Sequence, residues 1–173
     1  MKTFILITIM GLTSLFATTY QVDQEKSLVA FKITHAVVAK VEGKFNDFSG
    51  TYEYNDKLHY FSSFYGEAKI ASVDTDEPNR DKHLKEKLFE ASRYPTMSLK
   101  LISQDGSDFK ANLTIKGITK TIDFNIGLSP SNEKEFLLVG KINRKDFNLT
   151  FLDIGGMIVS DTVTINIMFT AKL

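Results

Sequence analysis

Polar and apolar residues alternate along most of this chain, and this period of two constrains the fold more than any other feature of the sequence. Successive side chains of a strand point to opposite faces, so the alternation is typical of strands with one buried and one solvated face. The alternation over 27–38 continues with the same period through 41–45. Counting that stretch once, we predict eight strands, at 27–45, 51–55, 59–70, 97–101, 109–116, 118–128, 136–143 and 161–173.

Short turns separate most of these strands, which favours an antiparallel meander that closes as either a sandwich or an up-and-down barrel. The last stretch, 161–173, is long, lacks proline and has an aliphatic face. An exposed edge strand of this kind promotes aggregation, and pairing it with the first strand removes that liability. We therefore favour a mainly β fold, an eight-stranded antiparallel barrel.

One stretch, 70–101, departs from the alternation and contains the only predicted helix, at about 79–90. Leu84 and Leu88 stand one helical turn apart, Phe89 lies beside Leu88, and charged residues surround them. This is the pattern of a short amphipathic helix with a narrow apolar stripe. The stripe is expected to pack over the barrel.

The ends of this helix carry their own signals. Pro78 suits the first turn, where its missing N–H has no cost. Asp76 or Asn79 can cap the helix by accepting a hydrogen bond from an unpaired backbone N–H. Tyr94-Pro95 ends it, because the residue before a proline is pushed out of the helical region.

The N-terminal stretch 1–17 predicts a secretory signal peptide. Lys2 precedes an apolar run over 4–16, and the small residue Ala17 follows it. The run is short for a membrane span, although an uncleaved anchor is the alternative. We expect an exported protein whose single domain spans 18–173.

Composition excludes several kinds of site. The 21 basic residues balance 21 acidic residues, which gives no support to nucleic-acid binding. The absence of cysteine removes disulfides, thiolate metal sites and cysteine nucleophiles. The three histidines, His35, His59 and His83, have no paired spacing, so we expect no metal site.

Catalytic motifs are equally scarce. No nucleophile elbow occurs in the sequence. Arg80-Asp81 and Arg144-x-Asp146 are interpreted as ion pairs that hold loops. An enzyme acting on a lipid-like substrate, with His35 or His83 and Asp74 or Asp81, is the alternative to a binding protein.

The inward face of the predicted barrel is rich in phenylalanine and aliphatic residues. An eight-stranded barrel can fill itself with such side chains or leave room for one small ligand. Composition does not choose between a packed core and a cavity.

Short motifs stand in a fixed order along the chain: Ser72-Val73-Asp74-Thr75, Arg80-Asp81-x-His83-Leu84, Tyr94-Pro95, Leu113-Thr114-Ile115-x-Gly117-Ile118-Thr119 and Asn143-Arg144-x-Asp146-Phe147. Their order and spacing, over 20–173, resemble the YceI-like family of periplasmic polyisoprenoid-binding proteins. Two residues depart from the family pattern. Lys26 stands at a usual histidine, and Asn148 at a usual glycine, where asparagine tolerates a left-handed backbone better than most residues.

The resemblance implies a lipocalin-like barrel with a helix over it. It also implies a periplasmic protein that binds a long-chain amphiphile, such as a polyisoprenoid, an isoprenoid quinone or a fatty acid or amide, in a hydrophobic tunnel. The role would be that of a carrier, a storage protein or a stress-related sensor. No enzymatic activity, cofactor, metal, nucleic-acid partner or stable membrane span is expected, and a homodimer can form.

The expected tunnel lining combines the inward apolar residues of the strands with the helix stripe: Phe31, Ile33, Phe45, Phe64, Ile70, Leu84, Leu88, Phe89, Met97, Leu99, Phe109, Ala111, Leu113, Ile122, Phe124, Ile165 and Ile167. Polar residues at or near strand ends are candidates for contact with a ligand head group: His35, Asp74, Arg144 and Asp146. A head group needs polar partners at fixed positions, whereas burial of the apolar tail has no direction.

Overall fold

A computed structural model describes residues 18–35, 39–129, 132–150 and 159–172, so the predicted signal peptide over 1–17 lies outside the described residues. The strands are β1 (Thr18–Gln21), β2 (Leu28–His35), β3 (Ala39–Phe45), β4 (Phe48–Asn55), β5 (Tyr60–Lys69), β6 (Val73–Asp74), β7 (Thr96–Asp105), β8 (Asp108–Ile115), β9 (Ile118–Ser129), β10 (Asn132–Asn143) and β11 (Val159–Thr170). The helical segments are η1 (Gln24–Lys26), η2 (Ile70–Ser72), α1 (Pro78–His83), η3 (Leu84–Leu88) and η4 (Arg144–Phe147).

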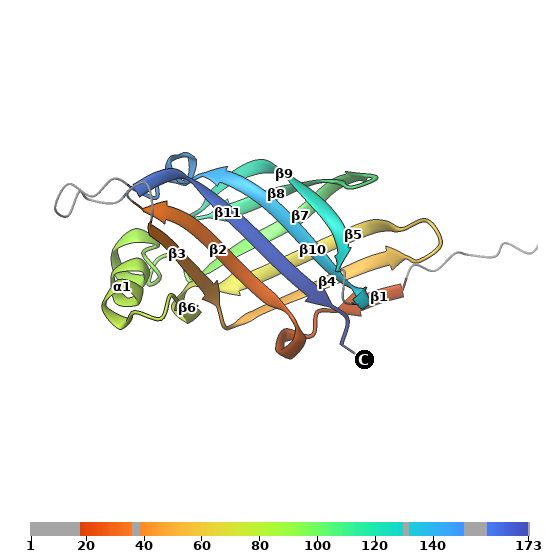
Figure 1. Cartoon of the computed structure of the whole chain (residues 1–173), viewed down its shortest axis with the longest axis horizontal. Coiled ribbons are helices and arrows are strands. Elements are labelled where there is room, and N and C mark those ends of the chain that lie inside the picture. Colours follow the sequence, from red (N-terminus) through yellow and green to blue (C-terminus); the bar gives the residue numbers. More distant parts are fainter. Residues whose placement is uncertain (1–17, 36–38, 130–131, 151–158, 173) are drawn as a thin grey trace, which may run out of the picture.

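These strands form one antiparallel sheet in the order β1-β4-β5-β7-β8-β9-β10-β11-β2-β3-β6. The sheet curls around its apolar face into a half-barrel, and α1 lies beside one end of it (Figure 1). β11 pairs with β2, with Ile165 opposite Phe31. The predicted pairing of the last strand with the first long one is therefore confirmed, and a single curled sheet forms rather than a sandwich.

The predicted number of strands, eight, is wrong, because the structure has eleven. The stretch 27–45 folds back on itself as the antiparallel pair β2 and β3, with Ile33 opposite Val41. This register pairs odd-numbered residues with odd-numbered ones, so the alternation continues unbroken through the reversal and hides it. The other two additional strands, β1 and β6, have four and two residues and are too short to show a period.

The predicted helix is present, and it has two parts. α1 is followed by the π-helical turn η3, and Leu84 and Leu88 of that turn are buried. Phe89 follows, with its ring 6.2 Å from the ring of Phe45 in an edge-on arrangement. The predicted apolar stripe thus packs on the sheet, because α1 and η3 lie over the part of the sheet that contains β3.

The helix cap differs from the prediction. Glu77, rather than Asp76 or Asn79, is the N-cap, and its carboxylate accepts the backbone N–H groups of Asn79 at 3.1 Å and Arg80 at 2.6 Å. Asp76 cannot take this role because it is in the left-handed region, with φ of 59°. Pro78 begins the helix as predicted.

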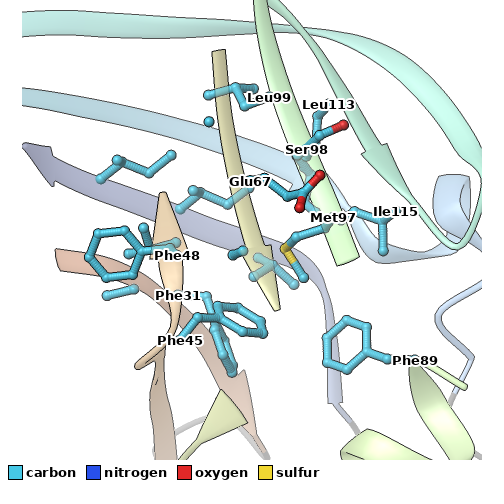
Figure 2. A pocket seen from close by; sticks show the side chains of 18 of the residues that line it. Phe31, Phe45, Phe48, Glu67, Phe89, Met97, Ser98, Leu99, Leu113 and Ile115 are labelled. Atoms are coloured by element: carbon cyan, nitrogen blue, oxygen red, sulfur yellow. The ribbon is translucent and has the colours of Figure 1, made fainter. Parts of the chain in front are cut away.

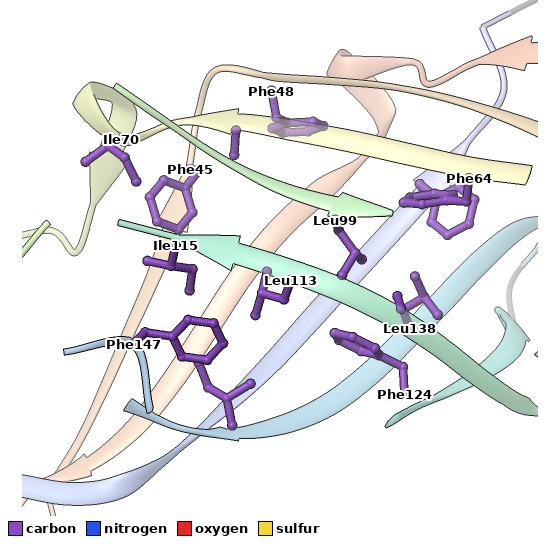
Figure 3. Packing of buried hydrophobic residues seen from close by; sticks show 14 of the residues in the cluster. Phe45, Phe48, Phe64, Ile70, Leu99, Leu113, Ile115, Phe124, Leu138 and Phe147 are labelled. Atoms are coloured by element: carbon purple, nitrogen blue, oxygen red, sulfur yellow. The ribbon is translucent and has the colours of Figure 1, made fainter. Parts of the chain in front are cut away.

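Most of the sheet interior is packed. Side chains from strands on both sides of the half-barrel, among them Phe64, Leu99, Phe124 and Leu138, converge in the core (Figure 3). Four of the core phenylalanines are at most 1% exposed: Phe61, Phe109, Phe147 and Phe169. A space that these side chains leave unfilled lies nearer the helix end.

Candidate ligand-binding cavity

The curled sheet and the helical segment enclose an apolar cavity of about 220 Å³. Phe45 from β3, Met97 from β7 and Phe89 beyond η3 point toward this space (Figure 2). Because one water takes up about 30 Å³ in the liquid, this volume corresponds to about seven groups of water or methylene size. The cavity therefore has room for part of a hydrocarbon chain and is too large to be a packing defect.

Glycines allow close packing in this wall. Gly50 of β4 lies directly opposite Gly66 of β5, and both line the cavity. A Cβ at Gly50 would lie 3.0 Å from Val22 Cγ2, and one at Gly66 would lie 3.3 Å from the ring of Phe64. At Gly43 of β3 the approach is closer still, because a Cβ there would lie 2.4 Å from the ring of Phe31. That close approach agrees with the bend or tight backbone contact expected of a glycine inside a strand.

Twelve of the residues expected to line a tunnel do line this cavity: Phe31, Ile33, Phe45, Phe64, Leu84, Leu88, Phe89, Met97, Leu99, Leu113, Ile165 and Ile167. Their contact with a ligand remains a prediction. Ile165 and Ile167 are half-buried although they face inward, because part of their surface borders the cavity.

The other five predicted residues do not line the cavity: Ile70, Phe109, Ala111, Ile122 and Phe124. Phe109 and Ala111 are completely buried in the packed part of the core. The ring of Phe124 lies over Gly140, where an added Cβ would be 2.5 Å from it. Ile70 has left the strand for η2, and Ile122 packs at the margin of the core.

Several residues that line the cavity were not predicted: Val22, Val29, Val41, Phe48, Ile115, Ile142, Leu149, Val159, Val163 and Phe169. Val41, Ile115 and Val163 share the inward face of their strands, so the same alternation could have found them. Phe48 was not assigned to a strand, because it directly follows Asn46-Asp47, a pair of residues typical of turns.

An aromatic cluster fills the sheet interior beyond one end of the cavity. Phe64 and Phe169 belong to both, with ring centroids 5.0 Å apart. Behind them, Phe169 stacks against Phe136 at 5.4 Å, and Tyr52 contacts Phe61 at 5.5 Å. Burial, followed by the nearby Tyr20 hydroxyl, raises the pKa of Tyr52 to about 12. Tyr52 is therefore uncharged at neutral pH, and the cluster forms an apolar wall at this end of the cavity.

Arg144, a predicted head-group residue, lines the cavity but is already engaged. Its guanidinium donates to the backbone oxygens of Leu149 at 2.7 Å and Ser160 at 3.1 Å. It also pairs with Asp161 at 3.0 Å rather than with the predicted Asp146. A hydrogen bond from Lys145, with the charge of Arg144 nearby, lowers the pKa of Asp161. These contacts fasten η4 to the start of β11.

Asp74 and Asp146, two other head-group candidates, do not line the cavity. Asp74 accepts hydrogen bonds from the Asp76 N–H at 3.0 Å and from Asn46 at 3.1 Å, and the former is the main reason its pKa is lowered. Asp146 is exposed on η4. His35 ends β2 opposite Ala39, and its side chain is outside the described part of the structure.

The alternative catalytic grouping is not assembled in the described part of the chain. The Asp81 carboxylate accepts hydrogen bonds from both the backbone N–H and the hydroxyl of Thr75. Asp74 is held in its own turn, and neither carboxylate has a hydrogen bond with His83. Within the described ranges, no three His, Asp or Glu side chains gather to hold a metal ion.

Arg80 was interpreted as an ion-pair partner of Asp81. In the structure these two side chains are instead joined through Thr75, which forms hydrogen bonds with both. The guanidinium of Arg80 donates from Nε to the Thr75 hydroxyl at 2.7 Å and from Nη2 to the Thr75 carbonyl at 2.6 Å. Thr75, which is 4% exposed, in turn donates a hydrogen bond from its hydroxyl to the Asp81 carboxylate. Arg80 also lines the cavity, although it was not among the predicted head-group residues.

Comparison with known proteins places this architecture in a family. The family model of the YceI-like domain matches residues 20–171. The chain belongs to the YceI-like family. Protein YceI of Salmonella newport is 30% identical over 151 residues, which cover 79% of each chain.

Two solved structures share the fold. The crystal structure of BcnA from Burkholderia cenocepacia gives a TM-score of 0.74 at 24% identity, with 87% of this chain and 99% of that chain covered. A polyisoprenoid binding domain from Saccharophagus degradans, implicated in plant cell wall breakdown, gives a TM-score of 0.69 at 16% identity, with 88% and 98% covered.

Two of the motifs that carry the YceI-like resemblance form hydrogen bonds near the cavity. In one motif the N–H of Thr75 donates to Asp81, and in the other the side chain of Asn143 caps η4 by accepting the N–H of Lys145. The departure at Asn148 is accommodated, because this residue is in the left-handed region with φ of 53°. Among the residues described, no helix combines the length and the apolar character needed to cross a bilayer.

Proposed function

We propose that this YceI-like protein binds the hydrocarbon tail of a long-chain amphiphile inside the cavity. The observation that carries the proposal is the apolar space enclosed between the curled sheet and the helical segment. The structural neighbour described as a polyisoprenoid binding domain supports the same chemistry. Candidate ligands are a polyisoprenoid, an isoprenoid quinone and a fatty acid or amide.

Burial of the tail supplies a driving force for this role without any reacting group. The roughly seven methylenes that the cavity holds give about 6 kcal/mol at ~0.8 kcal/mol each, and every further methylene that is buried adds the same amount. Association and ordering of the chain remove about 4–15 kcal/mol, depending on how rigid the partners are. The preformed wall keeps the protein's share of that cost low, which favours reversible binding by a carrier, a storage protein or a sensor.

The cellular setting is also part of the proposal. The apolar run over 4–16 behind Lys2 favours export and a periplasmic location. A protein outside the cytoplasm that shields a hydrocarbon tail from water would hold lipids that cannot cross an aqueous compartment unaided.

Extraction of the purified protein tests the proposal directly. Organic extraction followed by mass spectrometry is expected to release a long-chain lipid in a near-equimolar amount. The substitution Ile167→Trp, on the cavity wall, is expected to reduce that yield strongly because the larger ring occupies the tail's space. Ile102→Trp adds the same ring at a position that is 50% exposed and is the matched control. A clean extract from wild-type protein that also takes up no added polyprenol, quinone or fatty acid would refute the proposed function.

A further inference from the structure

Three residues with charged side chains border the otherwise apolar cavity: Glu67, Arg80 and Arg144. Glu67 alternates with the inward residues Gly66 and Ala68, so its carboxylate is on the outer face of β5 and accepts the Tyr65 hydroxyl at 3.1 Å. The charge of Arg144 is neutralised by its ion pair with Asp161. Neither residue offers a free charge to the cavity.

Arg80 differs from both. It is half-buried, and no carboxylate of the described residues forms an ion pair with it. A guanidinium has five N–H donors, and two of them are used by the hydroxyl and carbonyl of Thr75. The Asp81 carboxylate accepts two hydrogen bonds from Thr75 at one oxygen and forms no direct ion pair with Arg80. A positive charge with three remaining donors therefore stands at the helix end of an apolar cavity.

The setting of Arg80 determines what it can bind. Its position is fixed by two hydrogen bonds to one nearly buried residue, so little side-chain freedom remains to be lost when a ligand binds. A guanidinium is planar and weakly hydrated, and its fork of donors matches the oxygens of a carboxylate or phosphate. Such a group beside an apolar wall suits an anion that arrives attached to a hydrocarbon chain.

We infer that the cavity selects amphiphiles with an anionic oxygen head group, a carboxylate or a phosphate, and that Arg80 is the residue that binds it. The inference rests on the proposed function, since it requires the tail to occupy the cavity. It also orients the ligand: the head group lies at Arg80 beneath α1, and the tail runs toward the aromatic cluster at Phe64 and Phe169.

Calorimetric titration with ligands that share one saturated tail tests the inference. Hexadecanoate, hexadecyl phosphate, hexadecanol and hexadecylamine differ only in head group. Wild-type protein is expected to bind the two anions about 10- to 100-fold more tightly than the alcohol, as for a hydrogen bond to a charged group, and the amine most weakly. The stronger of the two anions identifies the source of the oxygen head group.

Variants then assign the preference to a residue. Arg80→Met, which keeps an unbranched apolar stem, is expected to abolish the preference for hexadecanoate over hexadecanol while hexadecanol still binds within about threefold of wild type. Lys82→Met, at an exposed position on the same helix, is the matched control and is expected to keep the preference. Arg80→Lys retains the charge and is expected to retain part of the preference.

The outcomes separate the inference from the function on which it rests. Equal binding of hexadecanoate and hexadecanol by wild-type protein would overturn the inference and leave the proposed function standing. Failure of all four ligands to bind would overturn the proposed function itself. A preference that persists undiminished in Arg80→Met would assign it to another cation and also overturn the inference. If Arg80→Met does not fold, the wild-type series and Arg80→Lys still decide: a partial loss of the preference in Arg80→Lys would support the inference, and an undiminished preference would overturn it.

Discussion

The aromatic end of the cavity should set the longest tail that the protein accepts, and Phe64→Ala tests this. The ring of Phe64 is 5% exposed, lines the cavity and contacts the rings of Phe109 at 5.8 Å and Phe169 at 5.0 Å. Removing it extends the cavity into the cluster. If the vacated space accepts about three methylenes at ~0.8 kcal/mol each, longer tails gain ~2.4 kcal/mol, or about 50-fold in Kd.

The same substitution weakens the protein, so a matched variant is needed. A buried Phe→Ala change costs about 3–5 kcal/mol of unfolding free energy. Phe136→Ala removes the same ring from the same cluster, where Phe136 is 6% exposed and 4.8 Å from Phe61, but Phe136 does not line the cavity. Both variants should lose similar stability in urea unfolding, and only Phe64→Ala should favour longer tails.

Titration of both variants with fatty acids of increasing length provides the assay. Wild type and Phe136→Ala are expected to reach their highest affinity at the same length, the one at which the tail fills the cavity. Phe64→Ala is expected to reach it about three methylenes later. An unchanged optimum in a folded Phe64→Ala protein would show that the tail does not end at the aromatic cluster, and the reasoning would be refuted.

Two further predictions concern stability. Gly140→Ala places a Cβ 2.5 Å from the ring of Phe124 and should lower the free energy of unfolding, measured in urea, by roughly 1–3 kcal/mol. Gly127→Ala meets no atom within 4 Å and should leave this free energy nearly unchanged. Equal effects of the two substitutions would contradict the close contact at Gly140. The pKa of Asp161 is lowered from its ordinary 3.8, mainly by Lys145, so its contribution is complete above that value and is lost as pH falls through the folded-state pKa. The difference in unfolding free energy between wild type and Asp161→Asn should therefore shrink from about pH 7 to about pH 3, and a constant difference would rule out this ion pair as its source.

The sequence was informative where periodicity and turn chemistry act locally. Alternation identified the long strands, the liability of an exposed edge strand predicted the pairing of β11 with β2, and the stripe of Leu84 and Leu88 identified the helix. Alternation could not detect the reversal between β2 and β3, because their register keeps odd residues on one face. The N-cap was also missed, since the left-handed conformation of Asp76 depends on how the loop meets the sheet.

The distinction between core and cavity could not be predicted from residue types, because the same apolar side chains line both. Ala111 and Leu99 stand on equivalent inward positions of adjacent strands, yet Ala111 is completely buried in the core and Leu99 borders the cavity. The difference comes from what stands across the strands. Leu99 is opposite Gly66, which in turn is opposite Gly50, whereas Ala111 lies between Leu101 and Ile122. Such a coincidence of glycines on neighbouring strands requires knowledge of the register.

The polar end of the cavity shows why Arg80 was not among the head-group candidates proposed from sequence. Asp74 and Asp146 stand at segment ends, but their environments direct them away from the cavity. Thr75 lies between its two charged neighbours: it donates its N–H and hydroxyl to the Asp81 carboxylate, and its hydroxyl accepts the Nε–H of Arg80. A threonine five residues before an Arg-Asp pair gives no sign of this bridge, since it depends on β6 bringing Thr75 against the first turn of α1. The charge at the cavity therefore results from a hydrogen-bond arrangement and cannot be derived from the charged residues alone.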